Sequence, residues 1–208
     1  CSTYIRRYMI SHFKEPVDVA SSNLAEAAAV FGGARNLGTA LENVVRQYRP
    51  QLVGIATTCL AETIGEDLNL VLSQVRAQSA VPLPEIVHVA TPSYSGTHAE
   101  GYWATVRALV ETLAQPGLAH ASINLLPGMV SPADLRALKS LAAGFGLELN
   151  LLADYSDTLD GPAWEEFHRI PPGGTPLDVI RRMGRARATI EFGGLGSGGP
   201  TAGQWLRE

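Results

Sequence analysis

The stretch PQLVGIATTCLAETIGEDLNLVLSQVRAQSAVPLPEIVHVATP, residues 50–92, indicates the fold of this chain most clearly. It contains two short apolar runs, LVGIA at 52–56 and EIVHVA at 85–90, and prolines punctuate both of them. Short apolar runs bounded in this way are typical of buried strands. Residues 68–78, which lie between them, are a helix candidate. A strand, a helix and a second strand in this order predict a parallel sheet covered by helices.

The alternation of strands and helices extends in both directions from this stretch. Further strands are expected at 121–126, 147–152 and 188–192, and further helices at 36–48, 99–114 and 132–145. Asn36 is the expected cap of the first of these helices, and Ser131 followed by Pro132 is the expected start of the last. We therefore predict an α/β fold with doubly wound, Rossmann-like parallel sheets that carry helices on both faces.

The segment Gln115-Pro116-Gly117 is the expected domain boundary. Residues 1–116 would then form a first α/β domain with the candidate ligands, and residues 117–208 would start a second, Rossmann-like domain. The segment 154–175 is long and carries two proline–glycine clusters, so we expect a functional or interfacial loop there. The chain begins on Cys1 rather than on methionine, and we expect a fragment that is truncated at both ends.

The composition excludes several classes of protein. Hydrophobic residues make up 46% of the chain, which excludes a disordered or collagen-like protein. The net charge of −4 argues against binding to nucleic acid or to a membrane surface, because both need clustered positive charge. The sequence has no membrane-spanning apolar run and no secretory signal, so we expect a cytoplasmic location. Charged residues make up only 17%, which fits a surface partly covered by a partner subunit.

Cys59 is the residue that the pattern singles out for chemistry. In open α/β sheets, ligands gather at the loops that leave the carboxyl ends of the strands, and Cys59 follows the strand 52–56 at such a loop. Backbone amides and a helix N-terminus at that turn would lower the pKa of its thiol. The segment 91–98, TPSYSGTH, leaves the next strand at the same edge and would place a hydroxyl or an imidazole beside Cys59.

The residues alone leave several interpretations open. Cys1 and Cys59 are either metal ligands or small buried hydrophobes, and the second role is the more common one for free cysteines. Cys59 would be a nucleophile if His98 or His88 served as its base, but no acylation motif surrounds it. The run 194–199, GLGSGG, matches the dinucleotide-binding pattern, although a glycine-rich turn between a strand and a helix explains it more simply.

A set of motifs along the whole chain resembles the β subunit of nitrogenase component 1. The first motifs are CSTYIRRY at 1–8, HFKEP at 12–16, TTCLAETIGEDL at 57–68 and TPSYSGTH at 91–98. LPG at 126–128, DYSDTLD at 154–160 and GGTP at 173–176 resemble the next domain of the same subunit. The resemblance spans about the first half of a family member, and it implies that this chain is part of a multi-domain subunit.

The resemblance also implies a cofactor and its ligands. In this family the β subunit contributes cysteines to an 8Fe-7S cluster, the P-cluster, at the interface with an α-type subunit. Cys1 and Cys59 match two of these cysteines by motif, and Ser93 matches a serine that binds an oxidised cluster iron in some members. A third cysteine ligand is expected upstream of Cys1. No residue of this chain is expected to perform the bond-making chemistry on substrate.

The implied activity is that of an oxidoreductase subunit in an α2β2 heterotetramer. An ATP-dependent iron protein would supply electrons, and the cluster would relay them to a cofactor held by the α-type subunit. Two alternatives remain within the family, namely a cofactor-assembly scaffold paralogue and a nitrogenase-like reductase of methylthio compounds. The presence of both Cys1 and Cys59 favours the electron-transferring chain over the scaffold, because scaffold members often lose these cysteines.

Overall fold

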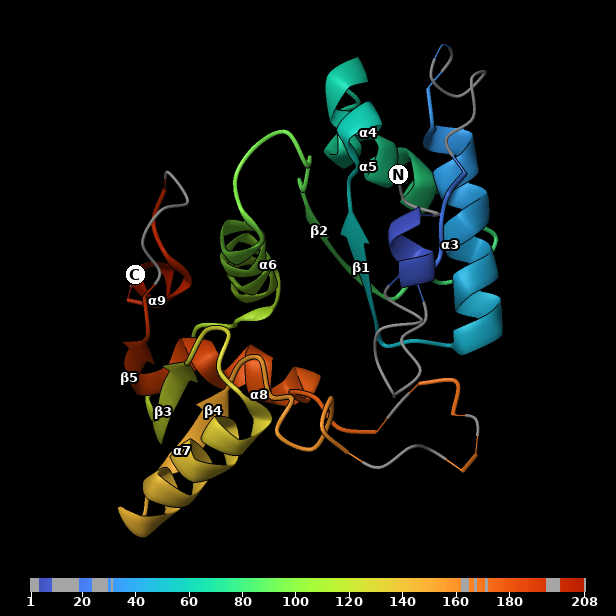
Figure 1. Ribbon diagram of the computed structural model, residues 1–208. Coiled ribbons are helices and arrows are strands. Elements are labelled where there is room, and N and C mark those ends of the chain that lie inside the picture. Colours follow the sequence, from blue (N-terminus) through green and yellow to red (C-terminus); the bar gives the residue numbers. More distant parts are fainter. Residues whose placement is uncertain are drawn as a thin grey trace. The chain divides into compact units, whose positions relative to one another are not determined.

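The structure is a computed structural model of the chain, and it describes residues 4–8, 19–23, 30, 32–161, 165–166, 168–170, 172–193 and 199–207. The chain divides into two compact units (Figure 1). One comprises Cys1–Ser95 with Glu165–Pro171, and the other comprises Gly96–Trp164 with Pro172–Glu208. None of the helices in the described ranges combines the length and the apolar character that crossing a membrane requires.

The first unit is built around two parallel strands. Its elements are α3 (Ala34–Tyr48), β1 (Leu52–Ala56), α4 (Cys59–Ile64), α5 (Leu68–Gln78) and β2 (Glu85–Val89). The strands β1 and β2 pair in parallel from Leu52 opposite Glu85 to Ala56 opposite Val89. Figure 1 shows them side by side, with α3 and α5 close to them. Their carboxyl ends therefore lie at the same edge of the sheet, where Cys59 follows β1.

The core of this unit joins α3 and α5 to one face of the two strands. Val53 and Ile55 of β1 pack against a cluster of buried side chains from α3, α5 and β2. These buried side chains are Leu41, Val71, Leu72, Val75 and Ile86. Side chains alternate between the faces of a strand, so Val53 and Ile55 share the face that the helices cover. The sequence expectation of strands joined by a helix is confirmed here.

The second unit contains a three-stranded parallel sheet of order β4-β3-β5. Its elements are α6 (His98–Leu113), β3 (His120–Leu126), α7 (Pro132–Gly144), β4 (Glu148–Leu151), α8 (Leu177–Arg182), the 3₁₀ helix η1 (Met183–Arg185), β5 (Ala186–Glu191) and α9 (Ala202–Trp205). In the part of the long connection between β4 and α8 that the structure describes, there is no helix or strand.

Helices cover both faces of this sheet. On one face, Leu135 of α7 packs with Leu125 and Leu151 of the strands. On the other face, Asn124 donates to the Met183 carbonyl of η1 at 2.9 Å, and Asn150 accepts from Arg182 of α8 at 2.8 Å. The two asparagines also bond to each other across the strands, so these buried amides are paired. The predicted doubly wound α/β architecture is confirmed.

Two details of the secondary structure differ from the sequence expectation. Asn36 does not cap α3: the helix begins at Ala34 with Gly33 as its N-cap, and Asn36 donates instead to the Asn23 carbonyl. The Glu66 carboxylate accepts the Gly33 N–H, so a distant residue satisfies this helix end. The sequence analysis gave no bounds for the short helices α4, α8 and α9, because six, six and four residues are too few to show a helical period.

The division between the units also falls elsewhere than near residue 116. The structure divides the chain after Ser95, so that α6 belongs to the second unit. This helix buries Val106, Val110 and Leu113, and it contacts α8 and α9. Thr97 and Glu100 form a capping box at its start, which separates it from the preceding loop. Gln115-Pro116-Gly117 is therefore a turn within the second unit, between α6 and β3.

Candidate functional site

The candidate site lies on the two loops that follow β1 and β2 in the first unit. Thr58 is the N-cap of α4, and Cys59 is its first residue. The Cys59 Sγ lies 2.8 Å from the Ser93 Oγ, and the Ser93 N–H donates to the same sulfur at 3.1 Å. Cys59 is half-buried and Ser93 is exposed. The structure thus brings together two of the three predicted site residues, although they are far apart in sequence.

These contacts favour the thiolate form of Cys59. The Ser93 hydroxyl and then the Ser93 N–H lower the pKa of the Cys59 thiol, and these effects outweigh the opposing effect of burial. A thiolate is the form of cysteine that binds metals and attacks electrophiles. Because the sulfur is partly exposed and carries a hydroxyl beside it, the pair can offer one soft and one hard ligand to the same cation.

The third predicted site residue, Cys1, lies outside the described residues, as does the core of the glycine-rich run at 194–198. In the described part of the chain, no group of three or more Cys, His, Asp or Glu side chains gathers in a way that could hold a metal ion. An iron–sulfur cluster needs a thiolate or an equivalent ligand for each iron that the sulfides leave open. The donor set of Cys59 and Ser93 therefore fits one corner of a shared cluster and not a complete site.

Among the described residues, no imidazole is hydrogen-bonded to the Cys59 sulfur, as the nucleophile interpretation would require. In the residues that the structure covers, the hydrogen-bond partner of its sulfur is Ser93 rather than an imidazole. His88 lies within β2 and is half-buried, and His98 opens α6 in the second unit. A serine hydroxyl with an ordinary, high pKa does not withdraw a proton from a thiol, so the pair is better suited to binding than to acylation.

Two threonines and one glutamate connect the same two loops. The Thr91 hydroxyl donates to the Thr57 carbonyl at 2.8 Å, and the Thr91 N–H donates to the Thr57 hydroxyl at 3.2 Å. The Thr57 hydroxyl in turn donates to the Glu62 carboxylate in α4. The sequence analysis did not single out Glu62 or the two threonines. The signal was present, because Thr57-x-Cys59 and Thr91-x-Ser93 repeat one spacing after neighbouring strands.

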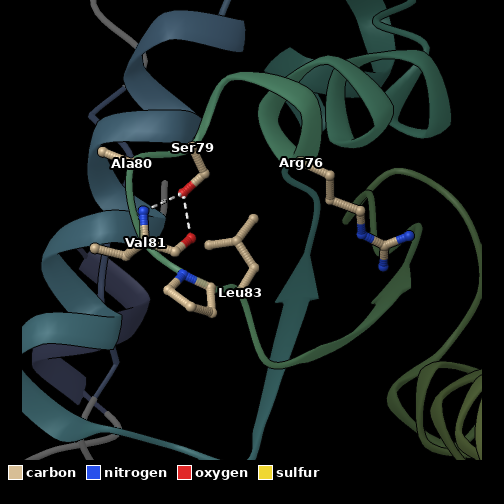
Figure 2. Close-up of a pocket in the computed structure, with 6 residues that line it drawn as sticks. Arg76, Ser79, Ala80, Val81 and Leu83 are labelled. Carbon is tan, nitrogen blue, oxygen red and sulfur yellow. Dashed lines mark hydrogen bonds between the residues drawn. The ribbon is translucent and has the colours of Figure 1, made fainter.

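A pocket of about 460 Å³ lies elsewhere in the first unit, where the chain passes from α5 to β2. Figure 2 shows its lining, which comprises Arg76, Ser79, Ala80, Val81, Pro82 and Leu83. The Ser79 hydroxyl donates to the Val81 carbonyl and closes this turn. The pocket precedes β2, whereas Cys59 and Ser93 follow the carboxyl ends of the strands. It therefore adds nothing to the candidate site.

A family model described as "Nitrogenase component 1 type Oxidoreductase" matches residues 1–208. The chain belongs to this family. The resemblance drawn from the motifs is thereby confirmed over the full length of the chain. The solved structure "Nitrogenase Cp1 at pH 6.5" superimposes with a TM-score of 0.87 and 34% identity, and the match covers 99% of this chain and 44% of that one.

Curated relatives that the chain matches include β chains of nitrogenase molybdenum-iron proteins. The nitrogenase molybdenum-iron protein β chain of Clostridium pasteurianum is 36% identical over 199 residues, which is 95% of this chain and 43% of the relative. The corresponding β chain of Frankia alni is 38% identical over 204 residues, which is 92% of this chain and 38% of the relative. The chain thus spans less than half the length of the curated relatives that it matches.

Proposed function

We propose that this chain is part of the β-type subunit of a nitrogenase, and that Cys59, Ser93 and Cys1 are ligands of an 8Fe-7S cluster shared with an α-type subunit. The observation that carries the proposal is the contact between the Cys59 sulfur and Ser93 at the carboxyl edge of a parallel sheet. Family membership supports it, and so do the names of the relatives, which are molybdenum-iron protein β chains.

The chain's own residues would hold the cluster and keep its environment constant. Cys59 would bind iron as a thiolate, and the Ser93 N–H would donate to the sulfur and stabilise its negative charge. The Ser93 hydroxyl would bind an iron after losing its proton, which an oxidised and more positive cluster favours. When bound, the cluster would accept electrons from an ATP-dependent iron protein and pass them to the cofactor of the α-type subunit. The whole assembly would be an α2β2 heterotetramer.

The low charged fraction supports a covered interface. Charged residues make up 17% of the chain, and obligate interfaces resemble a protein core more than an ordinary surface. Exposed apolar side chains lie near the candidate ligands in sequence, namely Leu60 beside Cys59 and Tyr94 beside Ser93. A partner that covers these two side chains would also supply the remaining iron ligands. The proposal therefore predicts that the chain retains its cluster only in the complex.

The test is the iron and sulfide content of the full-length chain, purified without oxygen. The chain would be expressed with and without its α-type partner, as wild type and as Cys59→Ala. We expect a full cluster only for wild type with the partner, because removing one thiolate or one partner leaves irons without ligands. Ser95→Ala, on the same loop as Ser93, is the matched control and should retain the wild-type iron content.

Two results would contradict the proposal. One is a full iron complement in Cys59→Ala with the partner, and the other is a monomer without the partner that carries the whole cluster. A chain that retains iron but receives no electrons from the iron protein would instead support the cofactor-assembly scaffold. Reduction of a methylthio compound and not of dinitrogen would support the other alternative within the family.

A further inference from the structure

Two side-chain hydroxyls replace the last backbone hydrogen bond of the ladder between β1 and β2, and we call this last pair of bonds the hydroxyl rung. The Thr57 N–H donates to the Val89 carbonyl at 3.1 Å, which is an ordinary bond of a parallel pair. In a parallel ladder the carbonyl of the same residue accepts the N–H two positions further on, which here belongs to Thr91. The Thr91 N–H donates instead to the Thr57 hydroxyl, and the Thr57 carbonyl accepts from the Thr91 hydroxyl.

This exchange uses the hydrogen-bonding capacity of both hydroxyls. Each hydroxyl has one proton to donate. Thr91 gives its proton to the Thr57 carbonyl, and Thr57 gives its proton to the Glu62 carboxylate while it accepts from the Thr91 N–H. Glu62 belongs to the same short helix as Cys59, so the network also joins that helix to the rung. Both threonines are half-buried, which limits their access to water.

We propose that Thr57, Thr91 and Glu62 are positioning residues. They keep the Cys59 sulfur and the Ser93 hydroxyl close enough to bind the same cluster. Cys59 lies two residues after Thr57, and Ser93 lies two residues after Thr91. The two hydroxyls join the strand ends in place of a direct N–H to carbonyl bond, and the two loops meet again at Cys59 and Ser93. The proposal rests on the proposed function only in what the pair binds; the geometry of the pair is independent of it.

The inference predicts a specific defect when one hydroxyl is removed. Thr91→Val keeps the β-branched shape but cannot donate to the Thr57 carbonyl. That carbonyl is then free to accept the Thr91 N–H, which would continue the backbone ladder by one rung. This bond would change the path of the loop that follows Thr91, and the Ser93 side chain would move away from Cys59. Thr91→Ser keeps the hydroxyl and should restore the wild-type geometry.

The first measurement needs no cluster. In a Ser93→Cys background, the full-length chain is assembled with its partner without iron and equilibrated with reduced and oxidised glutathione. The fraction of chains with a disulfide between Cys59 and the introduced thiol then reports how closely the two positions approach. We expect Thr91→Val to lower the equilibrium constant about tenfold or more, since small displacements of reacting groups have effects of this size. Thr91→Ser should stay within about twofold of the parent.

A matched control separates this effect from a general loss of stability. Thr39→Val removes an exposed hydroxyl that donates to the Arg35 carbonyl within α3, a helix of the same unit that carries neither candidate ligand. It should leave the disulfide equilibrium unchanged. If Thr91→Val fails to fold, Thr57→Val removes the other hydroxyl of the rung and should give the same tenfold loss. An unchanged equilibrium constant in the folded variant would overturn the proposal.

The second measurement uses the cluster. In the loaded complex, Thr91→Val should change the oxidised-state spectrum in the same direction as Ser93→Ala, and Thr91→Ser should reverse the change. A wild-type spectrum in Thr91→Val alongside a changed one in Ser93→Ala would also contradict the positioning role. Failure of the proposed function looks different, because Cys59→Ala would then retain its iron while the disulfide measurement still gave its result.

Discussion

The Cys59 sulfur accepts a hydrogen bond from the Ser93 N–H and lies within hydrogen-bond distance of the Ser93 hydroxyl. Pro92 precedes Ser93 and has no N–H, so Ser93 offers the first backbone donor after Thr91 in this loop. Hydrogen bonds to a thiolate stabilise the charged form and lower the pKa of the thiol. A single residue thus provides both a backbone donor and a hydroxyl next to the Cys59 sulfur.

Replacing Ser93 by alanine should raise the pKa of the Cys59 thiol. The hydroxyl is the largest cause of the lowered pKa, and its loss should move the value towards the ordinary range for cysteine, about 8.5. At a pH between the two values, wild type is largely thiolate and the variant is largely protonated. Iodoacetamide should therefore modify Cys59 more slowly in Ser93→Ala, and the rate should rise through a midpoint at higher pH. The measurement uses iron-free protein, with Ser95→Ala as the control.

At the scale of elements, α7 shows how local sequence determines one end of a helix. The Asp134 N–H donates to the Ser131 hydroxyl at 3.1 Å, and the Ser131 N–H donates back to the Asp134 carboxylate at 3.2 Å. Pro132 occupies the first turn, where no N–H is needed. The hydroxyl of Ser131 and then its N–H hold the pKa of the Asp134 carboxyl below its usual range. The sequence analysis expected the cap at Ser131 with Pro132 after it, and the structure adds the return bond to Asp134, which lies within the same four residues.

Ser131→Ala should destabilise the second unit by about 1 kcal/mol, the usual cost of losing an N-cap side chain. Urea unfolding measured against Ser140→Ala provides the comparison, because Ser140 is exposed on the same helix and donates only to the Arg136 carbonyl within it. That control should change stability by less than about 0.5 kcal/mol. The Asp134 pKa is lowered in the folded state, so its contribution is present above pH about 4 and is lost as the pH falls through the lowered value. The difference between wild type and Ser131→Ala should shrink over that range. An equal loss in both variants would contradict the capping role.

At the scale of the whole molecule, each unit has a buried apolar cluster of its own among the described residues. Leu72 belongs to the core of the first unit and Leu135 to that of the second, and they are 5% and 0% exposed. No residue is shared between the two buried clusters described here. Each unit therefore has its own source of hydrophobic stabilisation, as independent domains do.

Leu72→Ala and Leu135→Ala should each destabilise only one unit. Truncating a buried leucine costs about 2–5 kcal/mol, because apolar contacts are lost and a cavity remains. Amide hydrogen exchange should show lower protection of α3 and α5 in Leu72→Ala, and of α7 and β4 in Leu135→Ala. Leu141→Ala is the control, since Leu141 lies on α7 but is 58% exposed. Loss of protection in both units from either core variant would show that they unfold as one.

Short-range patterns in the chain were sufficient for the strand at 52–56, the helix at 68–78 and the cap at Ser131, which the structure places where they were expected. Apolar runs, proline punctuation and capping partners act within a few residues, so their effects can be read locally. The expectation that the loop 91–98 meets Cys59 was also correct, because parallel strands bring their carboxyl ends to one edge. The motifs also indicated the family to which the chain belongs.

Other features depended on contacts between distant residues. The sequence left open whether a hydroxyl or an imidazole would face Cys59, and the structure places Ser93 there. The structure also assigns α6 to the second unit. At the start of α3, Gly33 is the N-cap and its N–H donates to the Glu66 carboxylate, whereas the sequence had suggested Asn36 as the cap. The hydroxyl rung of Thr57 and Thr91 belongs to the same class. Each of these features depends on a contact between residues that are tens of positions apart in the sequence. Only the folded chain brings such residues together, so a local pattern cannot show which of them will interact.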